Sequence, residues 1–213
     1  MKIVLINDTS DNGHFGCQLV GKAYRDLLDE RGVEIIKTQY RREPLDRKAC
    51  DRADLVIVNG EGCIHHGKYE ELLQIGNEYP AILMNCSIQN LANNPYDSLR
   101  AFKRVTVRES YTYDYLRRIV GFGAHIVPDV IFARKLRRTR PVISKELFTS
   151  DCSRRSHQDW SCRAKSPDFL ATLSSYSHAS VGRFHAACAC AMMGIPFTAW
   201  RGNTWKVEGL LQD

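Results

Sequence analysis

Strand patterns alternate with helix patterns along residues 1–132, and this alternation limits the fold more than any other feature of the chain. Lys2–Asn7 is an apolar run typical of a buried strand. Gln18–Glu30 then carries apolar residues at helical spacing, and Gly32 ends the pattern. Further strand patterns follow at 33–40, 54–58, 81–85, 105–107 and 125–127, with a helix pattern at 68–78. Strands separated by helices form a mainly parallel sheet covered on both faces, so the sequence predicts a Rossmann-like α/β fold.

The alternation stops at residues 133–166 and resumes in a much shorter stretch, 167–213. The interrupting stretch is basic and Ser-rich with few apolar positions, which predicts a linker or flexible excursion. Beyond it, the patterns predict strands at 179–181 and 195–199 with helices around them. We therefore expect three parts: an N-terminal Rossmann-like unit at 1–132, the linker at 133–166, and a shortened C-terminal α/β unit at 167–213.

The composition indicates a globular protein without membrane spans. Of the 213 residues, 44% are hydrophobic, which is enough for a substantial core. No segment approaches the roughly 18 consecutive apolar residues of a membrane helix, and the apolar run Met1–Ile6 is too short for a signal peptide. The cysteines form no Cys-x-x-Cys pair, which favours buried reduced thiols over a structural zinc site. These features favour a cytoplasmic location.

The formal net charge of +6 makes anionic partners worth considering, and its distribution is more informative than its size. One dense basic cluster lies at 134–140 and consists of Arg134, Lys135, Arg137, Arg138 and Arg140. A run of charges is usually a solvated loop, which is the favoured interpretation. A peripheral membrane contact or a contact with a polyanionic glycan is the alternative. No nucleic-acid partner is expected.

The stretch Ser180–Glu208 holds the strongest functional signal. Gly182 permits a sharp turn after an apolar run, and Arg183 and His185 then begin an Ala- and Met-rich helix pattern. A cation and a titratable imidazole thus share a helix N-terminus, where anions are favoured. A buried core histidine is the structural alternative, but the neighbouring arginine favours function. The pair predicts a site that binds an anion while moving a proton.

Ligands of parallel α/β sheets bind beyond the carboxyl ends of the strands, so the loops that follow the predicted strands are candidate sites. The loop after the first strand is rich in turn-forming residues and includes Asn12, Gly13 and Gly16. Its backbone N–H groups suit a phosphate, but its spacing matches neither a P-loop nor a dinucleotide fingerprint. An ordinary strand-to-helix connection explains the loop equally well.

The loop after the third predicted strand combines glycines with acid–base groups. Gly60 and Gly62 flank Glu61, which indicates a close backbone approach to a ligand. His65 and His66 follow, so a carboxylate and an imidazole are available for acid–base chemistry. Adjacent histidines point in different directions, which argues against a shared metal ion, and no metal is expected. One of the two histidines fits a plain polar surface residue.

Charged residues also follow two later strands and precede the end of the chain. Arg108 lies at a strand end and suits a carboxylate or phosphate; an ion pair with Glu109 or Asp114 is the structural alternative. Asp129 follows Pro128 and either orients a basic partner or caps a turn. A last polar cluster consists of Asn203, Lys206 and Glu208. All of these side chains are candidates for ligand binding.

Taken in order, these segments resemble the polysaccharide pyruvyl transferase family. The resemblance spans about residues 3–211, and its motifs stand at predicted strand ends. The motifs are Asp11–Gly13 with Gly16, Asn59–Gly62, Val107–Ser110, Pro128–Asp129, Gly182–His185 and Gly194–Pro196, with Lys206 near the end. The resemblance implies a fold related to GT-B-like two-lobed transferases. Here the region between Asp129 and Pro167 is short and polar, so a shortened second lobe is expected.

The resemblance also implies a reaction and catalytic roles. Characterised members of the family move the pyruvyl group of phosphoenolpyruvate onto sugar hydroxyls, an activity of exopolysaccharide and cell-surface glycan synthesis. Arg183 and His185 correspond to the family's Arg-x-His pair, and Arg108 to its strand-end arginine. The arginines would hold the anionic groups, His185 would donate the proton or act as a base, and Glu61 is the second candidate base. No metal or organic cofactor is implied.

The implied substrate contacts extend over the other strand-end loops. The glycines of these loops would allow the backbone to approach the ligand: Gly13, Gly16, Gly60 and Gly62. The other expected substrate-binding residues are Arg108, Asn12, His65, Asp129, Asn203, Lys206 and Glu208. The expected partners are therefore phosphoenolpyruvate and a sugar or glycan acceptor.

Two other functions fit the same residues. A nucleotide-sugar-dependent glycosyltransferase would place Arg183 on the diphosphate. A non-catalytic homologue that binds an anionic glycan or a partner protein would suit the shortened second lobe. A homo-oligomer, in which a second subunit supplies the missing lobe, is also left open.

Overall fold

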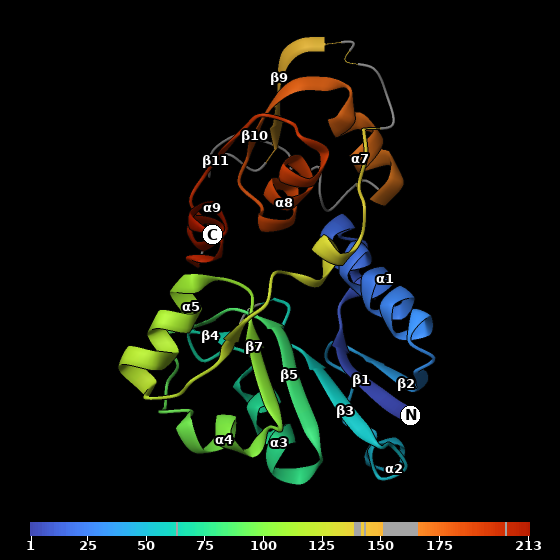
Figure 1. Cartoon of the computed structure of the whole chain (residues 1–213), viewed down its shortest axis with the longest axis vertical. Helices are drawn as coiled ribbons and strands as arrows, with labels where there is room; N and C mark the ends of the chain where they lie inside the picture. Colours follow the sequence, from blue (N-terminus) through green and yellow to red (C-terminus); the bar gives the residue numbers. More distant parts are fainter. Residues whose placement is uncertain (63, 139–141, 143, 151–165, 203) are drawn as a thin grey trace.

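The structure is a computed structural model that describes residues 1–62, 64–138, 142, 144–150, 166–202 and 204–213. It has two α/β parts, each built on a parallel sheet (Figure 1). The larger sheet and its helices occupy the lower half of the view, and the smaller sheet lies above them. Within the described residues, no helix combines the length and the apolar character that a membrane crossing requires.

The larger sheet is parallel throughout and runs in the order β2-β1-β3-β5-β7-β8. Its strands are β1 (Lys2–Asp8), β2 (Glu34–Tyr40), β3 (Leu55–Asn59), β5 (Ala81–Cys86), β7 (Arg104–Val107) and β8 (His125–Ile126). The predicted Rossmann-like parallel sheet is confirmed. The chain passes from β1 to β2 on one side and returns to β3 on the other, so the strand order reverses at β1. In open parallel sheets a ligand crevice lies at such a reversal.

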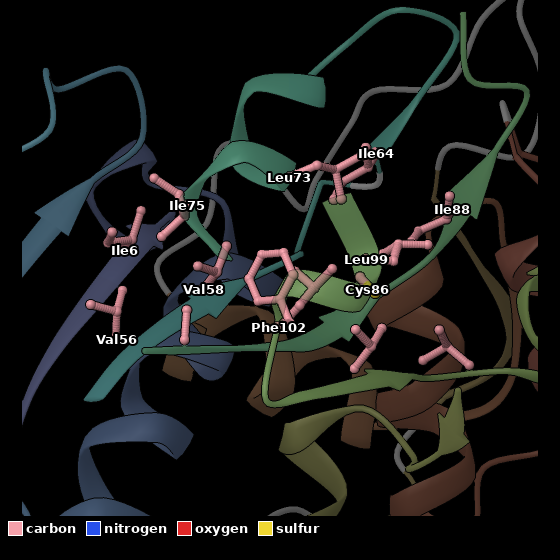
Figure 2. Close-up of a cluster of buried hydrophobic side chains, with 14 of the residues drawn as sticks. Ile6, Val56, Val58, Ile64, Leu73, Ile75, Cys86, Ile88, Leu99 and Phe102 are labelled. Atoms are coloured by element: carbon pink, nitrogen blue, oxygen red, sulfur yellow. The ribbon is translucent and has the colours of Figure 1, made fainter. Parts of the chain in front are cut away.

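The connections between these strands are mostly helical. They comprise η1 (Ser10–Asn12), α1 (Phe15–Glu30), α2 (Arg47–Cys50), η2 (Glu70–Gln74), α3 (Ile75–Glu78), α4 (Tyr96–Ala101), α5 (Ser110–Tyr115), the π-helical η3 (Leu116–Val120) and η4 (Val130–Ala133). A small parallel pair, β4 (Ile64–His65) and β6 (Ile88–Gln89), follows the ends of β3 and β5. Figure 2 shows the core beneath one face of the sheet, where Val56 and Val58 of β3 lie near Ile75 and Phe102. Burial of these apolar side chains is the main force that holds the helices to the sheet.

The helix predicted at 68–78 is shorter than the sequence pattern indicated. It begins only at Glu70, as the 3₁₀ helix η2, and continues as α3. Gly67 and Tyr69 have φ values of 74° and 62°, in the left-handed region that an α-helix excludes. The loop before η2 therefore stays irregular and faces the carboxyl ends of the strands.

The smaller sheet has the order β11-β10-β9 and is also parallel. It consists of β9 (Ser144–Ser150), β10 (Tyr176–Val181) and β11 (Phe197–Ala199), with helices α7 (Ser166–Ser174), α8 (Phe184–Met193) and α9 (Lys206–Gln212). The sequence assigned 133–166 to a linker or flexible excursion, which was wrong for β9. Phe148 is buried against the rings of Phe169 and Tyr176. The mostly polar composition of residues 133–166 gave no sign of this contact.

Buried apolar side chains join the two parts. Phe15, at the start of α1, stacks on Phe169 of α7 with ring centroids 3.9 Å apart. Phe184 and Cys188 of α8 belong to the same buried cluster as Leu5 of β1. Because close-packed apolar contacts fix the relative position of the elements, the N-terminus of α8 is held over the ends of the large sheet.

Part of the basic cluster at 134–140 is tied into the fold. Arg134 forms ion pairs with Asp26 and Glu30 of α1, at 3.0 and 3.2 Å. Arg138 donates a hydrogen bond to the Tyr176 carbonyl, at 3.2 Å. Lys135 and Arg137 are exposed, whereas Arg140 lies outside the described residues. The cluster is therefore more than the solvated loop that its composition predicted, because two of its arginines fasten the chain between the sheets.

Candidate active site

A cavity of about 300 Å³ opens where the carboxyl ends of β3 and β7 meet the start of α8; we call it the basic cavity. Its basic side chains are Arg41, Lys68, Arg108, Arg183 and Lys206. Its other acid–base side chains include His14, His65, His185 and Glu61. The structure thus brings together these residues singled out in the sequence: Glu61, Gly62, His65, Arg108, Arg183, His185 and Lys206.

Positive charge dominates the basic cavity. Among the described residues that line it, five are Lys or Arg and one, Glu61, is acidic. Arg183 is exposed and precedes α8, whose backbone N–H groups add partial positive charge at the same end. A cleft lined by several cations stabilises a bound anion. The cavity is therefore suited to a small ligand that carries more than one negative charge.

Arg108 and Asp129 form a buried ion pair beneath the cavity. Arg108 Nη1 donates to Asp129 Oδ2 at 2.9 Å, and Arg108 Nε donates to Ser87 Oγ at 3.0 Å. The guanidinium also lies over the Phe184 ring, 4.3 Å from its centroid. Asp129 is thus a buried ion-pair partner of Arg108, a pairing that the sequence alone did not predict. Glu109 accepts from the Thr112 N–H and caps α5.

Asp129 is ionised despite its burial. Burial alone raises the pKa of its carboxyl, but His185, Arg108 and the Ile131 N–H together lower that pKa to about 2. An ionised carboxylate can only accept hydrogen bonds. The Asp129 carboxylate therefore orients the basic groups around it, which places this residue under the cavity as a positioning group.

His185 lies in the first turn of α8 between two carboxylates. Its Nε2 is 3.4 Å from Asp129 Oδ2, and its Nδ1 is 3.8 Å from Glu61 Oε1. Since Asp129 can only accept, the Nε2 hydrogen faces Asp129, and Nδ1 is the nitrogen that can exchange a proton on the side of Glu61. A Cβ at Gly16 would lie 2.4 Å from Nδ1, so the absence of a side chain there sets the position of the ring. Gly16 acts on the imidazole rather than on a ligand.

Glu61 is held by a network at the ends of β1 and β3. Asn7 Nδ2 donates to the carbonyls of Asn59 and Glu61, at 2.6 and 3.2 Å. Asn59 Oδ1 accepts from the Glu61 N–H at 3.2 Å, and the Thr9 hydroxyl donates to the Glu61 carboxylate. Asn7 has φ 61°, a left-handed conformation that asparagine tolerates better than most residues. These contacts fix the backbone and the side chain of Glu61 toward His185.

His65 provides a neutral polar group rather than a charge. Burial lowers the pKa of His65, and the nearby His66, Lys206 and Lys68 lower it further. Asn90 Nδ2 lies 3.1 Å from His66 Nε2, and the two Nδ1 atoms of His65 and His66 lie 2.7 Å apart. The amide nitrogen of Asn90 donates, so His66 accepts at Nε2 and carries its hydrogen on Nδ1. His66 Nδ1 then donates to His65 Nδ1, and the hydrogen of His65 lies on Nε2. His65 is thus arranged as a neutral hydrogen-bond donor.

The cysteine in the basic cavity is not a nucleophile. Burial and the nearby Glu61 carboxylate raise the pKa of the Cys17 thiol to about 12. A thiolate is the reactive form of cysteine, and it is not populated near neutral pH at this position. The acid–base chemistry of the cavity therefore falls to its imidazoles and to Glu61.

Several predicted substrate-binding residues do not line the basic cavity. Gly60 packs on Cys86, where a Cβ would come within 2.1 Å of the Cys86 Cβ. Gly13 has φ 74° and ends η1, and a Cβ at this position would meet no atom within 4 Å. Asn12 is exposed and accepts from the His14 N–H at 2.8 Å. Of the four predicted glycines, Gly62 lines the cavity, while Gly13 serves a turn and Gly60 a close packing contact.

The C-terminal cluster is only partly at the site. Lys206, the first residue of α9, lines the basic cavity. Glu208 accepts from Arg201 Nε at 3.0 Å and does not line the cavity. Asn203 lies outside the described residues.

Sequence reasoning missed several residues that line the basic cavity: His14, Cys17, Arg41, Lys68 and Tyr69. Arg41 follows β2 directly, so a search of every strand end would have found it. His14 caps α1, Cys17 lies on α1, and Lys68 and Tyr69 lie in the irregular loop before η2; no local pattern distinguishes these four from surface residues. Among the described residues, no group of three or more His, Cys, Asp or Glu side chains is arranged to hold a metal ion.

Comparisons with known proteins give a family and a similar fold. The family model described as polysaccharide pyruvyl transferase matches residues 14–200. The crystal structure of a functionally uncharacterised protein from Klebsiella pneumoniae subsp. pneumoniae NTUH-K2044 is similar in fold, with a TM-score of 0.68 and 16% sequence identity. That similarity covers 99% of this chain and 87% of the other. No curated protein matches the chain by sequence.

Proposed function

Because this chain belongs to the polysaccharide pyruvyl transferase family, we propose that it transfers the pyruvyl group of phosphoenolpyruvate to hydroxyl groups of a sugar or glycan precursor. Family membership supports a transferase and implies a sugar or glycan acceptor. The identity of the donor is our inference. It is supported chiefly by one observation, the convergence of five cationic side chains with one carboxylate and His185 on a single small cavity.

Phosphoenolpyruvate suits the charge and the size of the basic cavity. It carries a carboxylate and a phosphate, and Arg183 and the lysines are placed to bind two such groups. Arg183 and the N-terminus of α8 favour the phosphate, because both offer N–H donors at one point. Buried Arg108 adds positive charge from below. The carboxylate and phosphate would thereby be held in one orientation relative to His185.

The reaction requires one proton to reach the methylene carbon, C3, of phosphoenolpyruvate. His185 Nδ1 donates this proton, and the positive character that develops at C2 is attacked by a sugar hydroxyl whose proton passes to Glu61. A C2–O bond to the sugar forms, and the C2–O bond to phosphate then breaks. A second hydroxyl of the same sugar closes a cyclic ketal, and its proton leaves with the phosphate. The products are a pyruvylated sugar and inorganic phosphate.

Asp129 supports this cycle without touching the substrate. Its carboxylate fixes the Nε2 side of His185 and stabilises positive charge on the imidazole before the proton is donated. Glu61 lies on the Nδ1 side, 3.8 Å away, so a proton taken by Glu61 can return to His185 directly or through a bound hydroxyl group. The two groups therefore form a pair that is restored at the end of each turnover.

The proposal is tested with the His185→Ala variant. Phosphate release from phosphoenolpyruvate, measured with a panel of sugars and glycans, should fall by about 10²–10⁴-fold relative to wild type. Thermal stabilisation by phosphoenolpyruvate should persist in the variant, because the cations remain. The matched control is His125→Ala, which removes an exposed imidazole on β8.

Two results would redirect the proposal. Stabilisation of the protein by a nucleoside diphosphate but not by phosphoenolpyruvate would indicate a nucleotide-sugar donor. Stabilisation by phosphoenolpyruvate without phosphate release from wild type or variant would indicate a binding protein without transferase activity.

A further inference from the structure

We propose that a second cavity, which shares a wall with the basic cavity, holds the sugar acceptor. We call it the adjoining cavity. It measures about 340 Å³ and lies between the ends of β1 and β2 on one side and η2 and α3 on the other. The inference rests on the proposed function, because it places the hydroxyl groups that would attack phosphoenolpyruvate.

Arg41 and Tyr69 form the wall between the two cavities. Both side chains line both cavities, and the Arg41 guanidinium carbon lies 4.2 Å from the centroid of the Tyr69 ring. Gly62 lies on the same wall, since a Cβ there would be 3.8 Å from the guanidinium carbon of Arg41. Its neighbour Glu61 lines the basic cavity. A ligand in the adjoining cavity would therefore meet the candidate base at the border with the donor.

Arg41 has an unused hydrogen-bond donor at this border. Its Nε is buried and has no hydrogen-bond partner among the described residues. A buried N–H without a partner is destabilising, and a bound acceptor atom would remove that penalty. Tyr69 also has a φ of 62°, which is unusual for a large side chain. Such a conformation persists where the position of the side chain is held by its surroundings, here by the stack with Arg41.

The charge balance of the adjoining cavity favours an uncharged ligand. Two arginines, Arg41 and Arg42, face three glutamates, Glu43, Glu71 and Glu78, on its lining. Glu43 accepts from the Tyr40 N–H, and Glu78 pairs with Arg47, so both are already engaged. The basic cavity has five cations and one carboxylate, so the two cavities differ in the ligand charge that they favour. An anionic donor is favoured on one side of the wall and a neutral ligand on the other.

The remaining polar and aromatic groups match a sugar. Glu71 and Gln74 offer carboxylate and amide groups to hydroxyls, and Tyr40 and Tyr69 add aromatic rings with polar ends. Leu72 contributes an apolar surface. Sugars combine apolar C–H faces with hydroxyl groups, so binding sites for them need both kinds of contact. A hexopyranose unit is the ligand class that this lining fits.

A third cavity, of about 350 Å³, also borders the basic cavity, through Arg108 and Phe184. Its lining is largely apolar and includes Ile126, Phe132 and Leu210. The Phe184 ring and the guanidinium stacked on it stand at the border. This side offers few groups that can bond to hydroxyls, so the adjoining cavity is the better acceptor site.

The test measures sugar binding directly, so it does not depend on turnover. Binding of methyl glycosides of galactose, mannose and glucose is followed by saturation-transfer NMR in the presence of phosphoenolpyruvate. Glu71→Gln and Tyr69→Ala should each weaken binding of the preferred glycoside about tenfold. Glu71 is exposed, so its variant is expected to fold normally even if loss of the Tyr69 ring disturbs packing. Tyr111→Ala, which removes an exposed tyrosine on α5, is the control and should bind like wild type.

The outcomes separate this inference from the proposed function. Weakened glycoside binding in both cavity variants, with thermal stabilisation by phosphoenolpyruvate unchanged in Glu71→Gln, whose side chain lines the adjoining cavity alone, supports the acceptor site. Absence of glycoside binding by wild type, or equal binding by wild type and both variants, overturns it whatever the donor result. Glycoside binding without any response to phosphoenolpyruvate would instead overturn the proposed donor and leave the sugar site standing.

Discussion

The basic cavity has charged groups in two kinds of surroundings. We call the buried Arg108, Asp129 and His185 its floor, and the exposed Lys68 and Arg183 its rim. In the floor, the side chains of Arg108 and Asp129 are 1% and 0% exposed. On the rim, Lys68 and Arg183 are exposed to solvent. Buried charge must be paired to be stable, whereas rim charge is solvated and screened by salt. Changes in the floor should therefore alter folding and chemistry together, and changes on the rim should alter binding alone.

The largest effect is expected from Asp129→Ala, which leaves Arg108 buried without its carboxylate. The free energy of unfolding should fall by about 3–5 kcal/mol, as for other buried pairs broken on one side. Urea unfolding followed by circular dichroism measures this loss. Arg47→Ala, which breaks the exposed pair with Glu78, is the control and should change stability little. Equal losses in the two variants would erase the distinction between buried and exposed charge.

Gly16→Ala should disturb the floor through packing rather than charge. The new Cβ would meet the His185 ring at 2.4 Å, so the imidazole or α1 must move. We expect a loss of about 1–3 kcal/mol in stability and a fall in kcat of about 100-fold, because the proton donor is displaced. Gly123→Ala is the matched control, since nothing lies within 4 Å of a Cβ there. Wild-type turnover in Gly16→Ala would show that the position of His185 is not critical.

The low pKa of Asp129 predicts acid sensitivity of the floor. The folded-state pKa is about 2, below the ordinary value of 3.8, so the carboxylate stabilises the fold above pH 4. This stabilisation, of about 2 kcal/mol, should be lost as the pH falls from about 4 to about 2. Unfolding midpoints in urea across that range measure the loss. In Asp129→Asn the urea midpoint should change less over the same pH interval. An equal dependence of the midpoint on pH in wild type and variant would show that Asp129 is not the group responsible.

The smallest effect on stability is expected on the rim. Arg183→Ala should raise the KM for phosphoenolpyruvate about tenfold, equal to about 1.4 kcal/mol, and change the free energy of unfolding by less than about 0.5 kcal/mol. The dependence of this KM on salt should also become weaker, because one screened charge is lost. Steady-state kinetics at low and high salt measure both effects. A large loss of stability in Arg183→Ala would show that Arg183 contributes to folding, as the buried charges of the floor do.

Much of the fold was predictable from local patterns. The strands of the large sheet were predicted close to their observed boundaries. For β1 and β3 the reason is that a buried parallel strand leaves a continuous apolar run. β9 was missed because it pairs with β10 through its backbone, and the burial of its Phe148 ring depends on distant residues. Composition averaged over the stretch cannot register one side chain.

The candidate site was predictable only as a set of separate positions. Glu61, Arg108 and His185 were identified because each follows a strand or begins a helix, where parallel sheets expose their ligand-binding loops. The partner of Arg108 was not identifiable, since the nearest acids in sequence were the obvious candidates. Tyr69 was not identifiable, because its place beside Arg41 depends on a contact between residues far apart in the chain.

The sequence by itself determined the parallel α/β sheet and the loops that carry reactive side chains, because apolar spacing and helix signals act over a few neighbouring residues. Only the tertiary structure decided that Asp129 lies under both Arg108 and His185, that Gly16 touches the His185 ring, and that two cavities share one wall. The reason is physical. These contacts join residues far apart in the chain, and they depend on strand order and on the apolar packing of α8 over the sheet, which no local pattern specifies.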